Sequence, residues 1–454
     1  MSDLPLNVCL SRSAASLDQD WLTRQLSHVL LSRIHDGRLT IVTPGGLRLS
    51  HGNGNGPEGV VVLHNWRALR RLVTRGDIAL AEAFIDGDWD SPDLPTLIEV
   101  AARNMPTLSK TFDANWLQRL RNRFTHRLNA NTKRGSKRNI RHHYDLGNAF
   151  YRTWLDTGMS YSSAIYTSAE QTLEDAQVTK QQRAMELMRT RPGLRVLEIG
   201  CGWGGLAEHL MGKAGCHVTG VTLSPAQLDY AQQRLGTAEL CGGITGSSDP
   251  GGRPFTSMLG EGHRAASDAE ATIPRRPGAE ATIPRRPGAD LRLQDYRDVA
   301  GRFDRIVSIE MMEAVGEAYW PSYFATLRDR LHAGGLAVIQ AITIAEDKFD
   351  GYRRCTDFIQ HYIFPGGMLP TVAEIRRQTE KSGLQLVSME TFGDSYARTL
   401  AEWRTRFHAA WPEIERLGFD TRFRRMWDYY LAYCEGGFRA GTIDVGLYVL
   451  AKPV

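Results

Sequence analysis

A glycine-rich turn stands where a strand-like apolar run passes into a helix-like pattern. Residues 196–205 read VLEIGCGWGG, with glycines at 200, 202 and 204 directly after the apolar run. Glycine adopts positive φ without steric cost and lets a ligand approach the backbone closely. The first N–H groups of the following helix are free to bind such a ligand. The turn therefore predicts a ligand site at the end of a strand.

Strand-like and helix-like patterns alternate from this turn to the end of the chain. The apolar runs are continuous rather than alternating, which is typical of parallel strands covered on both faces. The pattern predicts an α/β fold with a doubly wound, mostly parallel sheet. Strands are expected at 195–200, 217–222, 290–294, 303–310 and 335–343, with two later ones at 384–392 and 444–452.

The length of 454 residues exceeds what one compact domain usually holds. The first hundred residues mix short apolar runs and glycine turns with a helical pattern around Trp66 and Leu72, which predicts a small α+β domain. We expect an N-terminal, lipid- or membrane-associated domain at 1–118, a basic linker at 119–141 and the main domain at 142–454. A segment at 236–289, in which AEATIPRRPG occurs twice, interrupts the main domain as an expected disordered insertion.

Charge and cysteine content indicate which partners and which subcellular location to expect. A net charge of +4 is too mild to indicate nucleic acid, and the six cysteines form no C-x-x-C pair. No secretory signal is recognisable, and the apolar run at 336–345 is shorter than the ~20 residues that span a bilayer. A cytoplasmic protein is expected. The linker at 119–141 carries basic residues and no acid, which fits either a solvated linker or contact with anionic lipid.

A dinucleotide site is the first alternative for the glycine turn. Such a site places an acid after the second strand to bind the ribose hydroxyl groups. Here that strand ends in GVTLSPAQ at 220–227, without an acid, and the turn lacks the GxGxxG spacing. The sequence therefore disfavours NAD.

The motifs GCGWGG (200–205), GVTLSPAQ (220–227) and LQDYRD (293–298) resemble the S-adenosylmethionine site of the cyclopropane-fatty-acid and mycolic-acid synthases. Further matches lie at 142–151, 159–166, 308–316, 357–370, 392–407 and 429–441, and residues 76–94 resemble the N-terminal domain of that family. The resemblance implies a Rossmann-like class I methyltransferase with S-adenosylmethionine as cofactor. The implied cofactor-binding residues are Tyr161, Ser162, Glu198, Gly200, Cys201, Gly202, Trp203, Gly204, Thr222, Leu223, Ser224, Gln227, Gln294 and Asp295.

The reaction implied by the resemblance adds a methyl group to an alkene carbon and produces a carbocation. Such a cation needs shielding from water and is stabilised by aromatic faces. The matched motifs are rich in aromatic residues, although core packing is the commoner role of such side chains. The candidates are Tyr144, Phe150, Tyr151, Trp154, Tyr161, Tyr166, Tyr319, Trp320, Tyr362 and Phe364.

The cation must also lose a proton, and the resemblance implies a bound bicarbonate ion as its acceptor. Glu313 and Tyr396 match the family's ligands for this ion, and Ile342 matches the one that binds it through a backbone amide. Ser163 stands in place of a cysteine and Gln340 in place of a histidine. Neither replacement relays a proton as histidine does, so the sequence leaves two products open: a cyclopropane ring, or a methylene- or methyl-branched chain.

Two further residues are candidates for the active site. Glu310 departs from the glycine that the resemblance leads one to expect at its position, and the sequence favours a strand-end acid facing solvent over a carboxylate near the cation. Cys434 matches a cysteine regarded as reactive in the family, although a lone cysteine in an aromatic helix usually packs.

The implied partner is the acyl chain of a phospholipid, reached at the inner face of the membrane by a peripheral protein. Nucleic acid and metal are not expected, and a homodimer is left open. Two rivals remain. Methylation of a polar small molecule at O or N would require a general base near a polar acceptor, and a lipid-binding relative would bind the cofactor without turnover.

Overall fold

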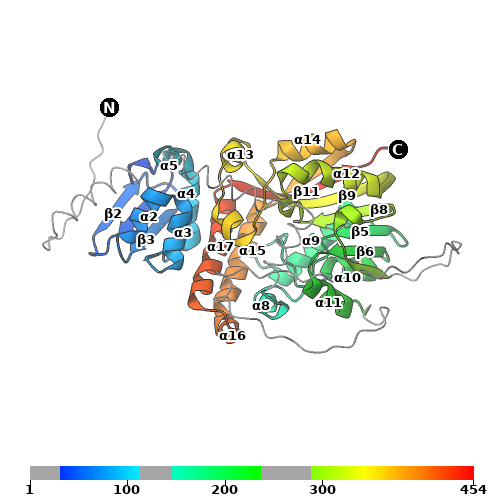
Figure 1. The fold of residues 1–454 in the computed structure, drawn as a ribbon, viewed down its shortest axis with the longest axis horizontal. Coiled ribbons are helices and arrows are strands. Elements are labelled where there is room, and N and C mark those ends of the chain that lie inside the picture. The colour runs from blue at the N-terminus through cyan, green and yellow to red at the C-terminus, as the bar shows by residue number, and fades with distance from the viewer. Residues whose placement is uncertain (1–30, 113–145, 237–287) are drawn as a thin grey trace, which may run out of the picture.

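The computed structural model describes residues 31–112, 146–236 and 288–454. An N-terminal α+β unit lies on one side and a larger α/β unit on the other, with helix α17 (Thr421–Arg439) standing where they meet (Figure 1). The predicted linker and nearly all of the predicted insertion lie outside the described residues, as does Tyr144.

The N-terminal unit is a small four-stranded sheet covered by helices. The sheet has the order β2-β1-β3-β4; β1 pairs in parallel with β3, and the two outer pairings are antiparallel. Its buried core includes Ile41, Leu63, Trp89 and Leu97. The elements are η1 (Leu31–Arg33), β1 (Arg38–Val42), β2 (Arg48–Gly52), β3 (Glu58–Leu63), α2 (Arg67–Arg75), α3 (Asp77–Ile85), β4 (Trp89–Asp90), α4 (Leu94–Arg103) and α5 (Met105–Phe112).

The larger unit is built on a seven-stranded sheet of order β10-β11-β9-β8-β5-β6-β7. β11 runs antiparallel to both of its neighbours, and the remaining pairings are parallel. The predicted doubly wound fold is confirmed, and all seven predicted runs form strands. The strands are β5 (Arg195–Ile199), β6 (His217–Thr222), β7 (Ala289–Leu293), β8 (Phe303–Ile309), β9 (Leu331–Ile344), β10 (Gln385–Thr391) and β11 (Ile443–Ala451).

Helices cover both faces of this sheet, which explains the continuous hydrophobicity of its strands. Along β5, Val196 packs into the cluster under helices α9 and α10, whereas the next residue, Leu197, packs into the cluster under α12 and α14. Both side chains are fully buried. The helices are α8 (Asn148–Arg152), α9 (Leu173–Leu187), α10 (Gly205–Gly212), α11 (Pro225–Arg234), η4 (Tyr296–Asp298), η5 (Met312–Ala314), η6 (Glu317–Tyr319), α12 (Trp320–Arg330), α13 (Glu346–Tyr352), the π-helix η7 (Ile359–Ile363), α14 (Val372–Ser382), α15 (Gly393–Ala409), α16 (Trp411–Arg416) and α17.

Helix α17 joins the two units through close packing and hydrogen bonds. Gly436 lies so near helix α4 that a Cβ on it would meet Ile98 Cγ2 at 2.7 Å. Arg425 donates to the backbone oxygen of Phe84 at 2.6 Å and to Asp90 Oδ1 at 2.6 Å. The two units therefore share one apolar boundary, along which a cavity extends.

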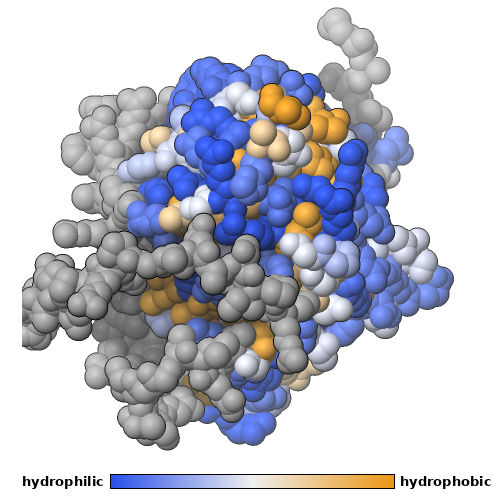
Figure 2. Space-filling view, turned by 90° about the vertical axis from the view of Figure 1, so that its right-hand side faces the viewer, coloured by the Kyte–Doolittle hydropathy of each residue, from blue (hydrophilic) through white to orange (hydrophobic). Residues whose placement is uncertain are grey.

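Among the described helices, none combines the length and the apolar character needed to cross a membrane. The face of the larger unit that points away from the N-terminal unit is mainly hydrophilic, with apolar side chains in small patches (Figure 2).

Candidate active site

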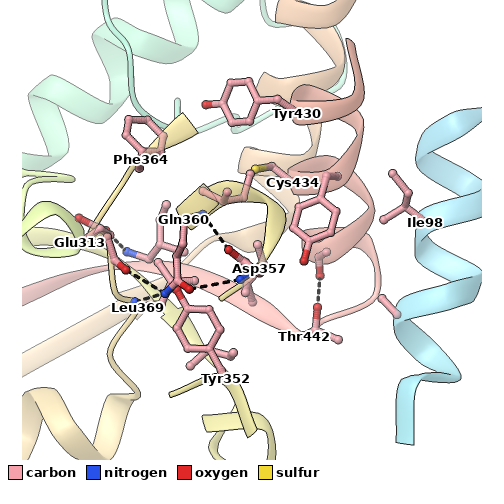
Figure 3. Close-up of a pocket in the computed structure, with 18 of the residues that line it drawn as sticks. Ile98, Glu313, Tyr352, Asp357, Gln360, Phe364, Leu369, Tyr430, Cys434 and Thr442 are labelled. Atoms are coloured by element: carbon pink, nitrogen blue, oxygen red, sulfur yellow. Dashed lines mark hydrogen bonds between the residues drawn. The ribbon is translucent and has the colours of Figure 1, made fainter. Parts of the chain in front are cut away.

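A cavity of about 1070 Å³ links the sheet edge of the larger unit to the interior of the N-terminal unit. It starts at the carboxyl ends of β5, β6 and β7, where ligands bind in open α/β sheets. It continues past η5 and the π-helix η7, along α17, and reaches β1, β3 and helices α2 to α5. Figure 3 shows Ile98 of α4 on one side of α17, with Cys434 and Tyr430 on the helix and Glu313 on the far side.

The glycine turn forms the first wall of this cavity. Gly200, Gly202 and Gly204 have φ values of +84°, +52° and +82°, which favour glycine. Gly200 and Gly202 line the cavity, and a Cβ on Gly202 would meet nothing within 4 Å. The turn thus leaves the backbone open toward the space that a cofactor would fill.

The loop after β6 forms the second wall. Thr222, Leu223 and Gln227 line the cavity. Thr222 Oγ1 donates to Gln227 Oε1 at 2.9 Å, and Ser224 caps helix α11 by accepting from the backbone N–H of Gln227. Hydrogen bonding thus fixes the conformation of this loop before any ligand binds. Ser224 is placed to build the loop rather than to line the cavity.

The residues predicted for the adenine edge lie at the end of β7. Gln294 lines the cavity and donates from Nε2 to the backbone oxygen of Asp298 at 2.7 Å. Asp295 binds the guanidinium group of Arg297 through both of its oxygens and caps η4. The carboxylate of Asp295 is therefore already engaged by a cation.

Three predicted cofactor residues direct their side chains into the protein. Trp203 is 3% exposed and donates from Nε1 to Asn148 Oδ1 at 2.8 Å. Cys201 is also 3% exposed and packs with Ala231 and Leu291. Glu198 is buried with no partner for Oε2 in the described part of the chain, and burial raises its pKa to about 8.

The segment before helix α9 brings Tyr161 to the cavity and holds it with buried polar groups. Tyr161 lines the cavity, and its hydroxyl pairs with that of Tyr430 at 2.7 Å. Ser162 accepts a 2.7 Å hydrogen bond from Nζ of Lys180, which is 3% exposed. Burial lowers the pKa of Lys180 to about 8, against the opposing effect of nearby acids, of which Glu310 acts most strongly.

Glu310 lies at the cavity wall and accepts three hydrogen bonds. Oε1 accepts from the backbone N–H of Ser163 at 2.8 Å and from Nε2 of Gln340 at 2.7 Å. Oε2 accepts from the hydroxyl of Tyr396 at 2.6 Å. Burial raises the pKa of Glu310, with the hydrogen bond from Tyr396 as the main opposing effect. The prediction that this acid faces solvent was wrong, because β8 ends one residue earlier and the chain turns the side chain inward.

Glu313 lies one short turn further along, in η5. Its Oε1 accepts from the backbone N–H of Ile342 at 2.5 Å, whereas Oε2 is buried without a partner among the described residues. Burial, and next the charge of Glu310, raise the pKa of Glu313 to about 8. The predicted set of Glu313, Tyr396, Gln340, Ser163 and Ile342 is thus brought together.

The same contacts test whether bicarbonate fits between these residues. The Ser163 N–H, the Gln340 amide and the Tyr396 hydroxyl all donate to Glu310, and the Ile342 N–H donates to Glu313. The Ser163 hydroxyl donates to the backbone oxygen of Ala164. Each donor expected to bind bicarbonate already binds an oxygen of the protein. The site in this conformation therefore does not fit a bicarbonate ion.

The aromatic side chains that face the cavity differ from those predicted. Among the members of the predicted set that the structure describes, only Tyr161 and Phe364 line it. Phe150, Tyr151 and Trp154 are fully buried in an aromatic cluster with residues of α15 and α17. The prediction was wrong for most of the described members of the set, because the cavity takes most of its aromatic wall from α13, α15 and α17, which lie between the last three strands in the sequence. The aromatic residues that line the catalytic part are Tyr161, Tyr296, Tyr352, Phe364, Tyr396, Tyr429, Tyr430, Tyr433 and Phe438.

Cys434 lies on the cavity wall beside Tyr430 (Figure 3). Burial raises the pKa of its thiol, followed by the charge of Asp357. Since the thiolate is the reactive form, this environment disfavours a nucleophilic role. Asp357 is itself within the cavity, and burial raises its pKa to about 6.

Sequence reasoning missed Lys180, Asp357, and the role of Tyr430 and Phe438. Lys180 reads as an ordinary surface residue of a polar helix, and no motif marks its burial. Tyr430 and Phe438 were within a matched motif, and their eight-residue spacing on one helix could have indicated a shared face.

Comparison with known proteins gives a family for this architecture. The family model described as mycolic acid cyclopropane synthetase matches residues 131–242 and 279–447. The chain is 33% identical over 453 residues to tuberculostearic acid methyltransferase UfaA1 of Mycobacterium tuberculosis, covering 98% of this chain and 92% of that protein. It is 32% identical over 402 residues to cyclopropane-fatty-acyl-phospholipid synthase of Escherichia coli, covering 88% of this chain and 90% of that protein.

Solved structures share the fold. Mycolic acid cyclopropane synthase CmaA1, complexed with SAH and CTAB, matches with a TM-score of 0.56 and 25% identity, covering 70% of this chain and 98% of that one. Coclaurine N-methyltransferase matches with a TM-score of 0.57 and 18% identity, covering 83% of this chain and 99% of that one, which shows the fold alone.

Proposed function

This chain belongs to the mycolic acid cyclopropane synthetase family, and we propose that it transfers the methyl group of S-adenosylmethionine to a double-bond carbon in an unsaturated phospholipid acyl chain. The observation that carries this proposal is the cavity of about 1070 Å³ that reaches from the glycine turn to the N-terminal unit. One end is a glycine turn with open backbone, and the rest is lined mainly by apolar and aromatic side chains. Such a space suits a polar cofactor beside a hydrocarbon chain.

The cofactor supplies an electrophilic methyl group on a sulfonium centre. The residues that would hold it are those at the carboxyl ends of three adjacent strands: the turn at Gly200 and Gly202, the loop from Thr222 to Gln227, and Gln294. Their fit rests on the positive φ of the turn and the unfilled space at Gly202. Glu198, whose Oε2 has no partner within the part of the chain that the structure describes, lies two residues before the turn.

The acyl chain would lie along α17 and extend toward the N-terminal unit. The wall there is apolar on both sides, with Ile98 and Leu80 on the N-terminal side and Phe438 on α17. Transfer of each methylene group from water contributes about 0.8 kcal/mol. A long acyl chain therefore gains affinity from this apolar part of the cavity. The same wall excludes water from the cation that methyl addition leaves on the chain.

The aromatic wall stabilises that cation. Tyr161, Tyr396, Tyr430 and Phe438 face the same part of the cavity as Glu313, and the rings of Tyr396 and Phe438 lie 4.6 Å apart between centroids. Aromatic faces attract a cation, by about 2 kcal/mol or more where water is excluded. The Glu313 carboxyl group, with its free oxygen, adds a polar group at the same place.

A cyclopropane ring is the product that the family resemblance favours. A methylene- or methyl-branched chain is the second candidate, and the replacement of cysteine by Ser163 and of histidine by Gln340 favours it. The ring forms when the new methyl group loses a proton and its carbon bonds to the cationic carbon. The branched chain, which keeps a double bond, forms when a hydride first shifts from the methylated carbon to the cationic carbon, or when a neighbouring chain carbon loses the proton. The enzyme would meet its lipid as a peripheral protein at the inner face of the membrane, with the basic stretch at 119–141 near anionic lipid.

The test is methyl transfer by purified protein. Vesicles of phospholipids with one cis-unsaturated chain are incubated with S-adenosylmethionine carrying a deuterated methyl group, and the fatty acids are analysed by mass spectrometry. Label in a saturated ring or in a branch identifies the product. Cofactor binding without label in any fatty acid would leave the lipid-binding relative as the better description.

The control separates the alkene from the rest of the lipid. Vesicles of fully saturated phospholipid with the same head group should yield no labelled chain, because they offer no double bond. Label in the head group of either lipid would instead favour methylation at O or N.

A further inference from the structure

The carboxylate of Glu310 occupies a set of donors that converge from three separate elements. The Ser163 N–H comes from the segment before α9, the Gln340 amide from β9 and the Tyr396 hydroxyl from α15, at 2.8, 2.7 and 2.6 Å. Each distance is normal for a hydrogen bond to a carboxylate. Glu310 itself lines the cavity next to Glu313.

These donors are the positions that the family resemblance assigns to a bound bicarbonate ion. The remaining assigned donor, the Ile342 N–H, binds Glu313 instead. A bicarbonate ion and a carboxylate share the same planar pair of acceptor oxygens. We infer that the Glu310 side chain takes the place of this ion and is the proton acceptor of the reaction, an inference that rests on the proposed methyl transfer.

The backbone at this position supports the assignment. Glu310 has a φ of +48°, one of three positive values among the described residues other than glycine. A side chain in this conformation is disfavoured, and such strain concentrates at functional sites. Glycine, which the family pattern leads one to expect here, would adopt it freely. The chain therefore keeps a glutamate where its backbone favours glycine.

The charges around the site also disfavour an additional anion. Glu310 and Glu313 already place two carboxyl groups at one wall, and the charge of Glu310 helps to raise the pKa of Glu313. Lys180 is a buried cation that interacts with Glu310, but its Nζ donates to Ser162. A bicarbonate ion would have to enter beside these acids without a free donor.

The proton step is balanced with Glu310 as the acceptor. The two π electrons of the alkene would form the bond to the methyl carbon as its bond to sulfur breaks, with the electron pair of that bond staying on sulfur, and a cation would be left on the neighbouring chain carbon. A C–H bond then breaks: the proton passes to a Glu310 oxygen, and the electron pair closes either the three-membered ring or a new double bond. The carboxylate becomes a neutral carboxyl group and is restored by losing its proton to solvent.

The first experiment uses the unaltered protein in buffer freed of carbon dioxide. Turnover on unsaturated phospholipid vesicles should proceed at its full rate and should not change when sodium bicarbonate is added. A requirement for added bicarbonate would overturn the inference without any variant.

The second experiment replaces the carboxylate. Glu310→Gln keeps the shape but accepts no proton, and we expect kcat to fall by about 10²–10⁴-fold, as is usual for loss of a general base. Cofactor affinity, measured by calorimetry, should stay within about twofold. Glu317→Gln is the matched control, because Glu317 lies seven residues further on, outside the cavity, where it pairs with Arg353. Full turnover by folded Glu310→Gln would overturn the inference.

The third experiment removes the Glu310 carboxylate, so that the groups that donate to it lose their acceptor. Glu310→Gly relieves the backbone strain and should bind cofactor normally, yet it should be inactive without carbon dioxide and regain turnover when bicarbonate or formate is added. Absence of rescue in this variant would show that the donors do not form an anion site. If the unaltered protein itself labels no unsaturated lipid, the proposed function fails, and that result is distinct from each outcome above.

Discussion

Tyr396 donates a hydrogen bond of 2.6 Å to Oε2 of Glu310 and so ties helix α15 to the end of strand β8. The two residues lie 86 positions apart in the sequence. This contact sets both the position and the acidity of the carboxylate, because a donor favours its charged form.

Tyr396→Phe should shift the pH dependence of turnover. Burial raises the pKa of Glu310, and the hydrogen bond from Tyr396 opposes that effect. Without this bond the pKa rises further, so the carboxylate becomes protonated at a higher pH and the acidic limb of the pH–rate profile moves upward. The groups that face Glu310 and would also respond are Lys180 and Glu313.

The size of the effect follows from the bond that is lost. A hydrogen bond to a charged group contributes about 1.5–3 kcal/mol, so kcat at neutral pH should fall by about tenfold or more. Tyr362→Phe removes a phenol hydroxyl that binds Glu82, outside the catalytic part, and serves as the control. An unmoved acidic limb in Tyr396→Phe would show that Glu310 does not govern the rate.

Glu313→Ala should abolish turnover and leave cofactor binding nearly intact. Glu313 accepts from the Ile342 N–H with one oxygen, and its other oxygen is buried without a partner in the described ranges. We expect the acyl cation, rather than the cofactor, to meet this group. Glu313→Gln keeps an acceptor for Ile342 and should recover part of the rate. Calorimetry of cofactor binding tests this assignment. A loss of cofactor affinity as large as the loss of turnover would mean that Glu313 belongs to the cofactor site.

Leu69→Trp should impair use of long acyl chains. Leu69 lies on α2 and lines the N-terminal part of the cavity. The larger indole ring shortens the N-terminal part of the cavity. For long acyl chains kcat/KM should therefore fall by about tenfold, which corresponds to about 1.4 kcal/mol. For short acyl chains the decrease in kcat/KM should be smaller. Val387→Trp, at an exposed position of β10, is the control. Equal rates across chain lengths would place the acyl chain elsewhere.

Glu198→Gln should stabilise the protein at alkaline pH. Burial raises the pKa of Glu198 from 4.5 to about 8, with Lys180 as the opposing influence. The folded state therefore prefers the protonated form, and its stability falls as pH rises from about 4.5 to about 8. Glutamine mimics the protonated form at every pH.

Thermal unfolding checks this prediction. The melting temperatures of the variant and the unaltered protein should be similar near pH 5, and the variant should melt a few degrees higher near pH 9. A constant difference at all pH values would indicate a packing effect instead of titration.

The sheet was predictable because its signal is local. Val196 and Leu197 are both apolar, and only a strand with helices on both faces buries two consecutive side chains in this way. The strand ends were predicted within a few residues. The largest shift is at β9, which begins at Leu331 rather than at 335.

The site was less predictable, because its groups meet only after folding. Motif matching selected Tyr396, Gln340 and Ser163, but their common partner Glu310 was assigned to solvent, since a sequence pattern does not show which way a strand-end residue turns. Lys180 was missed because its burial depends on tertiary packing: helix α9 packs behind the cofactor turn, and the sequence of the helix does not show this. The aromatic wall was misassigned because large rings serve the core and the cavity equally well.

The positive φ at position 310 has a consequence for how such enzymes diverge. Two glycine codons become glutamate codons by a single base change, and the backbone keeps the positive φ that suits glycine when it receives the longer side chain, so the exchange adds local strain but no rearrangement. An ancestral enzyme that used a bound bicarbonate ion as its base could therefore acquire a side-chain base through one base change. The reverse substitution would also need only one base change.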